Sequence, residues 1–113
     1  MKINVREDKS VTILELKGNI MGGEDETTFY DQLHELIDKG RIKVVLDLSR
    51  VEWINSRGLG ILISGLTTMK NNSGELKLAR TSEKVESLLT MTRLITAFEH
   101  YDSVDEAVAS FAG

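Results

Sequence analysis

The chain has 113 residues, of which 41% are apolar, and this size suits one packed domain spanning residues 1–113. A formal net charge of −4 argues against nucleic acid as a partner, because binding to phosphate backbones needs clustered Lys and Arg. The sequence has no Cys, which excludes disulfides and thiol catalysis, and no apolar run of the roughly 20 residues needed to cross a bilayer.

Runs of apolar and polar residues predict an alternation of strands and helices. The predicted elements are, in chain order, strand 3–5, strand 11–16, helix 24–39, strand 42–48, helix 56–71, strand 76–78, helix 82–91, a short edge strand within 98–101 and a helix after the capping pair Ser103 and Glu106. Helical spacing is clear in Phe29, Leu33 and Leu36, and Gly40 suits the position just after that helix.

This alternation argues for an α/β fold with a mixed four- to five-stranded sheet and about four α-helices. The first two strands form a hairpin, and a right-handed crossover makes the second and third strands parallel. The loops that follow these two strands, 18–25 and 51–57, then lie at one edge of the sheet. Sites in open α/β sheets form at this edge, so the sequence directs attention to Asn55 and Ser56.

Ser56 precedes a helical pattern and is predicted to be its N-cap, a role that explains a Ser by itself. Gly58 and Gly60 follow inside the first turns, where each costs roughly 1 kcal/mol relative to Ala. Two interpretations stay open: the glycines leave the helix start bare for another molecule, or they allow tight packing against a neighbouring strand. Because a helix start favours anions, the fold should tolerate a phosphate on Ser56.

The stretch VVLDLSRVEWINSRGLGILISGL resembles the signature of STAS domains, and in particular of bacterial anti-sigma-factor antagonists. The resemblance covers nearly the whole chain and includes Gly18, GELKLA at 74–79 and SVDEAV near the end. It implies a non-enzymatic switch whose serine, here Ser56, is phosphorylated by an anti-sigma factor with GHKL-type serine kinase activity. The unphosphorylated form binds that kinase and frees the sigma factor, and a serine phosphatase resets the switch.

The first residues lack the apolar run of a signal peptide, so we expect a cytoplasmic protein. We also expect a monomer or weak dimer, with no cofactor of its own and no membrane partner. We expect its partner-binding residues on both loops at the sheet edge. They are Met21, Gly22, Gly23, Glu24, Asp25, Asn55, Ser56, Arg57, Gly58, Leu59 and Gly60.

Two residues depart from the family pattern. Asn55 stands where Asp is usual, and Arg57 stands where Ser or Thr is usual. Arg57 either stabilises a phosphate on Ser56 or pairs with an acidic patch on a divergent kinase. The departures keep a second function open, in which a STAS-like scaffold binds a partner without phosphorylation within a sensory or transport assembly.

The acidic run Glu24, Asp25 and Glu26 begins a predicted helix, where it interacts favourably with the helix dipole. A second hypothesis is that a phosphate on Ser56 repels this run or a partner docked on it. The run is not predicted to hold a metal.

Several other residues have structural and functional interpretations. Trp53 is expected to be at least partly buried, with a partner hot spot as the alternative. Met69 and Met91 are predicted to lie in the core. A receiver-type phosphoacceptor at Asp47 is disfavoured because the acidic pair it needs would lie in a hairpin turn. A small enzyme or nucleotide binder is disfavoured because phosphate-loop and dinucleotide fingerprints are missing.

Overall fold

The computed structural model describes residues 1–112, and within them the chain forms five strands, four α-helices and one 3₁₀ helix. In chain order these are β1 (Lys2–Asp8), β2 (Val11–Lys17), α1 (Glu24–Asp38), β3 (Lys43–Arg50), α2 (Ser56–Asn71), β4 (Glu75–Ala79), α3 (Glu83–Met91), η1 (Ile95–Ala97), β5 (His100–Tyr101) and α4 (Val104–Ser110). The predicted α/β class and element order are confirmed, and η1 is an addition that the sequence pattern did not indicate.

The strands form one mixed sheet in the order β1-β2-β3-β4-β5. β1 and β2 are antiparallel, and each later neighbour is parallel, as predicted for β2 and β3. Lys9 and Ser10 both have positive φ, at 51° and 69°, which is the backbone of a two-residue turn whose twist matches a hairpin. Because β2 and β3 run in the same direction, the loops that follow them leave the sheet at one edge.

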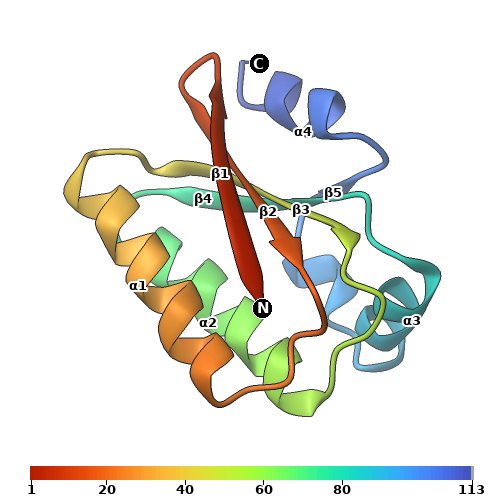
Figure 1. Ribbon diagram of the computed structural model, residues 1–113. Coiled ribbons are helices and arrows are strands. Elements are labelled where there is room, and N and C mark those ends of the chain that lie inside the picture. Colours follow the sequence, from red (N-terminus) through yellow and green to blue (C-terminus); the bar gives the residue numbers. More distant parts are fainter. Residues whose placement is uncertain (113) are drawn as a thin grey trace.

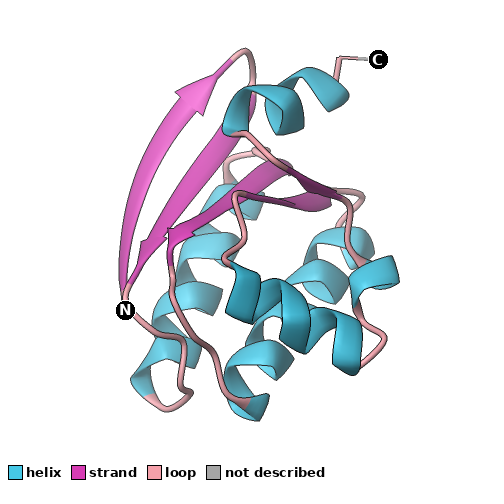
Figure 2. Ribbon diagram, turned by 90° about the vertical axis from the view of Figure 1, so that its right-hand side faces the viewer, coloured by secondary structure: helices cyan, strands magenta, loops and turns pink. Residues whose placement is uncertain are grey.

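Helices cover the two faces of the sheet unequally (Figures 1 and 2). α1, α2 and α3 lie on one face, over a large core that includes Leu14, Phe29 and Leu62. α4 lies alone on the opposite face, over a smaller cluster built around Ile13 and Val45. None of the helices within residues 1–112 combines the length and apolar character that crossing a bilayer requires.

Helix ends mostly follow the sequence signals. α1 ends at Asp38, and Gly40 adopts a left-handed φ of 74° just beyond it, as its position predicted. The N–H of Gly40 donates to the Ile37 carbonyl at 2.9 Å, and the N–H of Arg41 donates to the Leu36 carbonyl at 2.8 Å. This pair of bonds is a Schellman motif, which satisfies carbonyls that the helix itself leaves free.

One core prediction is wrong. Met69 is buried as expected, but Met91 is 80% exposed. Met91 is the last residue of α3, and two residues of helical rotation separate it from Leu89, which does face the core. Trp53 is partly covered, with 45% of its surface exposed.

Candidate functional site

The loops that follow β2 and β3 lie side by side at the start of α1 and α2 (Figure 1). Ile20 and Ile54 form an isolated parallel bridge between them, and both side chains are buried. The N–H of Asn55 also donates to the Ile20 carbonyl at 3.4 Å. Parallel pairing therefore continues past the ends of the strands and holds residues 18–23 against residues 51–55.

Asn55, not Ser56, caps α2. Its side-chain Oδ1 accepts a hydrogen bond from the N–H of Gly58 at 2.8 Å, while its Nδ2 donates to the Met21 carbonyl at 3.1 Å. Asn is as good a cap as Ser, and here it also ties the two loops together. The prediction that Ser56 is the N-cap is wrong because the helix begins one residue earlier than that role requires.

This shift frees the Ser56 side chain. Ser56 is the first helical residue of α2 and is exposed, and its hydroxyl has no hydrogen-bond partner among residues 1–112. The helix start is therefore already capped without this hydroxyl. A group attached to Ser56 would lie in solvent beside the free N–H groups of the first turn.

The two glycines of the first turns have different roles. A Cβ at Gly58 would lie only 2.0 Å from the Ile20 carbonyl oxygen, so Gly58 permits the close approach of α2 to the neighbouring loop. A Cβ at Gly60 would meet nothing within 4 Å, and Gly60 is exposed. Tight packing thus explains Gly58, whereas Gly60 leaves a bare surface on α2.

Arg57 lies across the neighbouring loop. A Cβ on Gly22, whose φ is 99°, would lie 3.0 Å from Arg57 Cδ and 3.1 Å from Arg57 Cβ, so the bare loop backbone supports the arginine stem. No carboxylate in residues 1–112 lies within 4.0 Å of the guanidinium. Arg57 also lines a groove of about 450 Å³ with Glu26, Tyr30 and Gly60.

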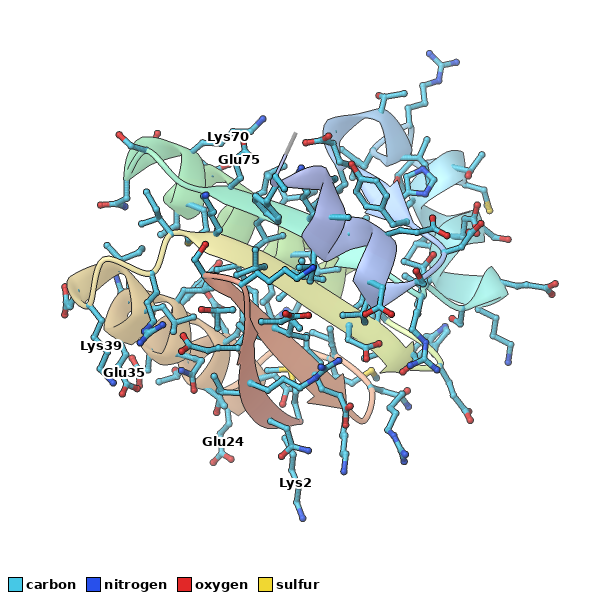
Figure 3. The ribbon with its side chains drawn as sticks, turned by 90° about the horizontal axis from the view of Figure 1, so that it is seen from above. Lys2, Glu24, Glu35, Lys39, Lys70 and Glu75 are labelled. Atoms are coloured by element: carbon cyan, nitrogen blue, oxygen red, sulfur yellow. The ribbon has the colours of Figure 1, made fainter. Side chains whose placement is uncertain are left out.

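The acidic run at the start of α1 does not act as one cluster. Asp25 accepts hydrogen bonds from the Met21 N–H and from the Met1 ammonium, both at 3.1 Å. Burial by itself raises the pKa of Asp25, but these two hydrogen bonds and the ammonium charge outweigh it and lower the pKa. Glu24 and Glu26 are exposed, and Glu24 projects away from the body of the protein (Figure 3). No group of acidic or His side chains in the described residues is arranged to hold a metal ion.

The predicted partner-binding residues divide into a surface set and a buried set. Gly58 and Leu59 are buried, with Leu59 only 6% exposed, so these two shape the site from beneath. Asn55 and Asp25 are partly buried and hold the loops in place. Glu24 is exposed but projects away from the body of the protein. The other members form what we call the Ser56 face, which consists of Met21, Gly22, Gly23, Ser56, Arg57 and Gly60.

Asp47 is part of the interior of the protein. Asp47 is 1% exposed, and its carboxylate accepts a hydrogen bond from the Ser49 N–H at 3.0 Å and lies 3.7 Å from Arg80. A phosphoacceptor must be reached by its phosphate donor, so this burial agrees with the structural interpretation of Asp47.

A second surface hollow was not predicted from the sequence. Trp53 and Met91 are both exposed and line a groove of about 490 Å³, which Ile54 and Leu88 also line. The helical pattern of α3 had assigned Met91 to the core, and no sequence signal placed α3 beside the connector at Trp53.

Several known proteins resemble this chain in sequence or in fold. A Thermotoga maritima protein named as a candidate anti-sigma factor antagonist is 36% identical over 74 residues, which cover 66% of this chain and 66% of the relative. A crystal structure of a T. maritima protein described in the same terms has a TM-score of 0.86 at 29% identity and covers 96% of this chain and 92% of its own. The phosphorylated form of the Bacillus cell fate determinant SpoIIAA shares the fold, with a TM-score of 0.72 at 12% identity over 97% of this chain and 99% of its own.

The STAS domain model matches residues 2–107, which include both loops of the site and all of α2. This match covers nearly the whole chain, and the five-stranded mixed sheet of residues 1–112 agrees with it. The chain therefore belongs to the STAS domain family, and its relatives carry the name of anti-sigma factor antagonists.

Proposed function

We propose that this chain is a partner-switching antagonist of an anti-sigma factor, controlled by phosphorylation of Ser56. Its unphosphorylated form binds an anti-sigma factor with GHKL-type serine kinase activity, phosphorylation releases it, and a serine phosphatase restores it. The chain is a substrate of that kinase, which supplies ATP and magnesium, and performs no catalysis itself. The observation that carries the proposal is the exposed Ser56 hydroxyl, which α2 does not use for capping.

Electrostatics favour a phosphate at this place. Phosphorylation adds about −1.5 to −2 charges, and the start of a helix stabilises negative charge by about 0.3–1 kcal/mol when exposed. The first turn of α2 has no acidic residue and contains Arg57, whose guanidinium lacks a partner within residues 1–112. The fold can therefore accept the phosphate, while a protein docked on the Ser56 face meets a new double charge.

The relatives support the same interpretation. The names of the T. maritima proteins refer to an anti-sigma factor partner, and SpoIIAA shows that a protein of this fold exists in a phosphorylated form. Ser56 begins the helix that follows the third strand, and the STAS match spans it.

The test uses purified GHKL-type serine kinases encoded in the genome that encodes this chain. Each is incubated with the protein, ATP and magnesium, and the product is analysed by mass spectrometry. We expect one phosphate on Ser56, its loss in Ser56→Ala and its retention in Ser64→Ala, a matched control because Ser64 is also exposed on α2. Phosphorylated protein should bind the kinase at least about tenfold more weakly. A phosphate elsewhere, or no phosphate with any kinase, would overturn the switch.

A second function is favoured by Asn55 and Arg57, the two departures from the usual motif. The Arg57 guanidinium stands in the first turn of a helix, where a cation is electrostatically unfavourable unless an anion compensates it. In this second function, an acidic patch of a partner supplies that anion and no phosphate is needed. Binding without phosphorylation in the same assay would identify it.

A further inference from the structure

Trp53 and Met91 line a groove near the Ser56 face, formed by the connector 51–55 and α3. The groove has a volume of about 490 Å³, and Ile54 and Leu88 contribute to its lining. Beyond Met91 it continues into a second hollow of about 480 Å³ along α3. Single exposed apolar residues are ordinary on protein surfaces, but two large ones that line the same hollow mark a place for a partner.

The groove is held in shape by hydrogen bonds outside the helices and strands. The Ser82 hydroxyl donates to the Glu52 carbonyl at 3.2 Å, which ties the start of α3 to the connector. The N–H of Trp53 donates to Asn19 Oδ1 at 3.2 Å, which fixes the tryptophan backbone against the loop after β2. A rigid aromatic side chain loses little entropy when it is covered, and this is why Trp is common among interface hot spots.

Charges at the rim indicate what kind of segment fits. Glu83 and Glu86 on α3 and Glu52 on the connector are exposed, and within residues 1–112 none of them lies within 4.0 Å of a cation. Glu83 and Glu86 lie in the first turn of α3, where negative charge interacts favourably with the helix dipole. Among the residues that line the two hollows, Glu83 and Glu86 are acidic and Lys84 is basic, and Glu52 lies on the adjoining connector. The charge around the groove is therefore negative overall. A complementary segment carries an apolar side chain flanked by Lys or Arg.

We propose that the groove receives such a segment from the same anti-sigma factor that binds the Ser56 face, an inference that rests on the proposed function. Trp53, in the connector, stands three residues before Ser56, the first residue of α2, and both lie at the edge of the sheet where β2, β3 and β4 end. A standard interface buries about 800 Å² on each partner, enough to extend from one feature to the other. The groove binds the apolar side chain of the partner, and phosphorylation of Ser56 changes the charge beside it.

The test measures the affinity of each candidate GHKL-type kinase for Met91→Glu and for Thr67→Glu by calorimetry. Both positions are exposed on helices, so both variants should fold, and both add one negative charge. Thr67 lies on α2, outside the groove. We expect Met91→Glu to weaken binding at least about tenfold, while Thr67→Glu stays within about twofold of the wild type. Replacing Glu83 and Glu86 with Lys together should also weaken binding about tenfold or more.

Phosphorylation of Ser56, followed in parallel, separates the two proposals. If Ser56 is phosphorylated and Met91→Glu binds as well as Thr67→Glu, the groove proposal is overturned and the switch stands. If Met91→Glu weakens binding to a kinase that never phosphorylates Ser56, the groove proposal is supported and the switch fails. If no candidate kinase binds the wild-type protein, both proposals fall together.

Discussion

The side chain of Asn55 joins the loop after β2 to the helix after β3 by donating a hydrogen bond to the Met21 carbonyl at 3.1 Å. The same side chain accepts from the Gly58 N–H at 2.8 Å, so one amide performs two tasks that need opposite hydrogen-bonding groups. The aspartate that is usual at this position of the motif can accept from Gly58 but cannot donate to Met21. The departure at Asn55 therefore has a structural consequence, which is a fixed contact between the two halves of the Ser56 face.

This dual role predicts a graded effect of substitution at Asn55. Asn55→Ala removes the cap and the link between the loops, so the free energy of unfolding should fall by about 2 kcal/mol, since each contributes about 1 kcal/mol. Asn55→Asp retains the cap and should cost less than about 1 kcal/mol. Urea denaturation followed by far-ultraviolet circular dichroism measures both. Equal losses in the two variants would show that the cap contributes nothing beyond the link.

Gly58 and Gly60 should respond to alanine in opposite directions. A Cβ at Gly58 would lie 2.0 Å from the Ile20 carbonyl oxygen, so Gly58→Ala should destabilise the protein by about 1–3 kcal/mol. A Cβ at Gly60 meets nothing within 4 Å, so Gly60→Ala should stabilise α2 by about 0.5–1 kcal/mol. Thermal unfolding of the two variants side by side gives the comparison. Stabilisation by Gly58→Ala would contradict the close approach of α2 to the loop.

Asp25 should make the free energy of unfolding depend on pH in the acidic range. Its pKa is lowered in the folded protein, so the carboxylate contributes fully above its unfolded pKa of about 3.9, and the contribution is lost as the pH falls through the folded pKa. Asp25→Asn should therefore cost about 1 kcal/mol or more at pH 7, and the gap to the wild type should close under acid. Denaturant titrations between neutral and acidic pH measure this gap. Asp31→Asn, at an exposed position of the same helix, is the control and should show little effect at any pH.

A negative charge at Ser56 should leave the fold intact. Ser56→Asp places a carboxylate in the first turn of α2 and should raise the free energy of unfolding by about 0.3–1 kcal/mol at low salt. The gain should shrink in about 1 M salt, where the Debye length is about 3 Å. Ser64→Asp, in the middle of the same helix, should show no such gain. Destabilisation by Ser56→Asp would mean that α2 does not tolerate an anion, which would count against the switch.

The order and type of the elements follow from local information, and so they could be predicted. The apolar spacing of Phe29, Leu33 and Leu36 marks α1 because helical periodicity depends only on near neighbours. The parallel arrangement of β2 and β3 follows from the handedness of a single crossover. That arrangement was enough to place loops 18–25 and 51–57 at one edge before any contact between them was known.

The sequence by itself determined the family, the topology and the position of Ser56 at a helix start, because these depend on periodicity, handedness and a short motif. Only the tertiary structure decided that Asn55 caps α2, that Gly58 packs while Gly60 stays bare, and that Met91 faces solvent beside Trp53. The packing of Gly58 depends on the Ile20 carbonyl, the link made by Asn55 depends on the Met21 carbonyl, and the groove at Met91 depends on the connector beside α3. Such contacts arise only when the sheet brings its loops together, and so no local pattern encodes them.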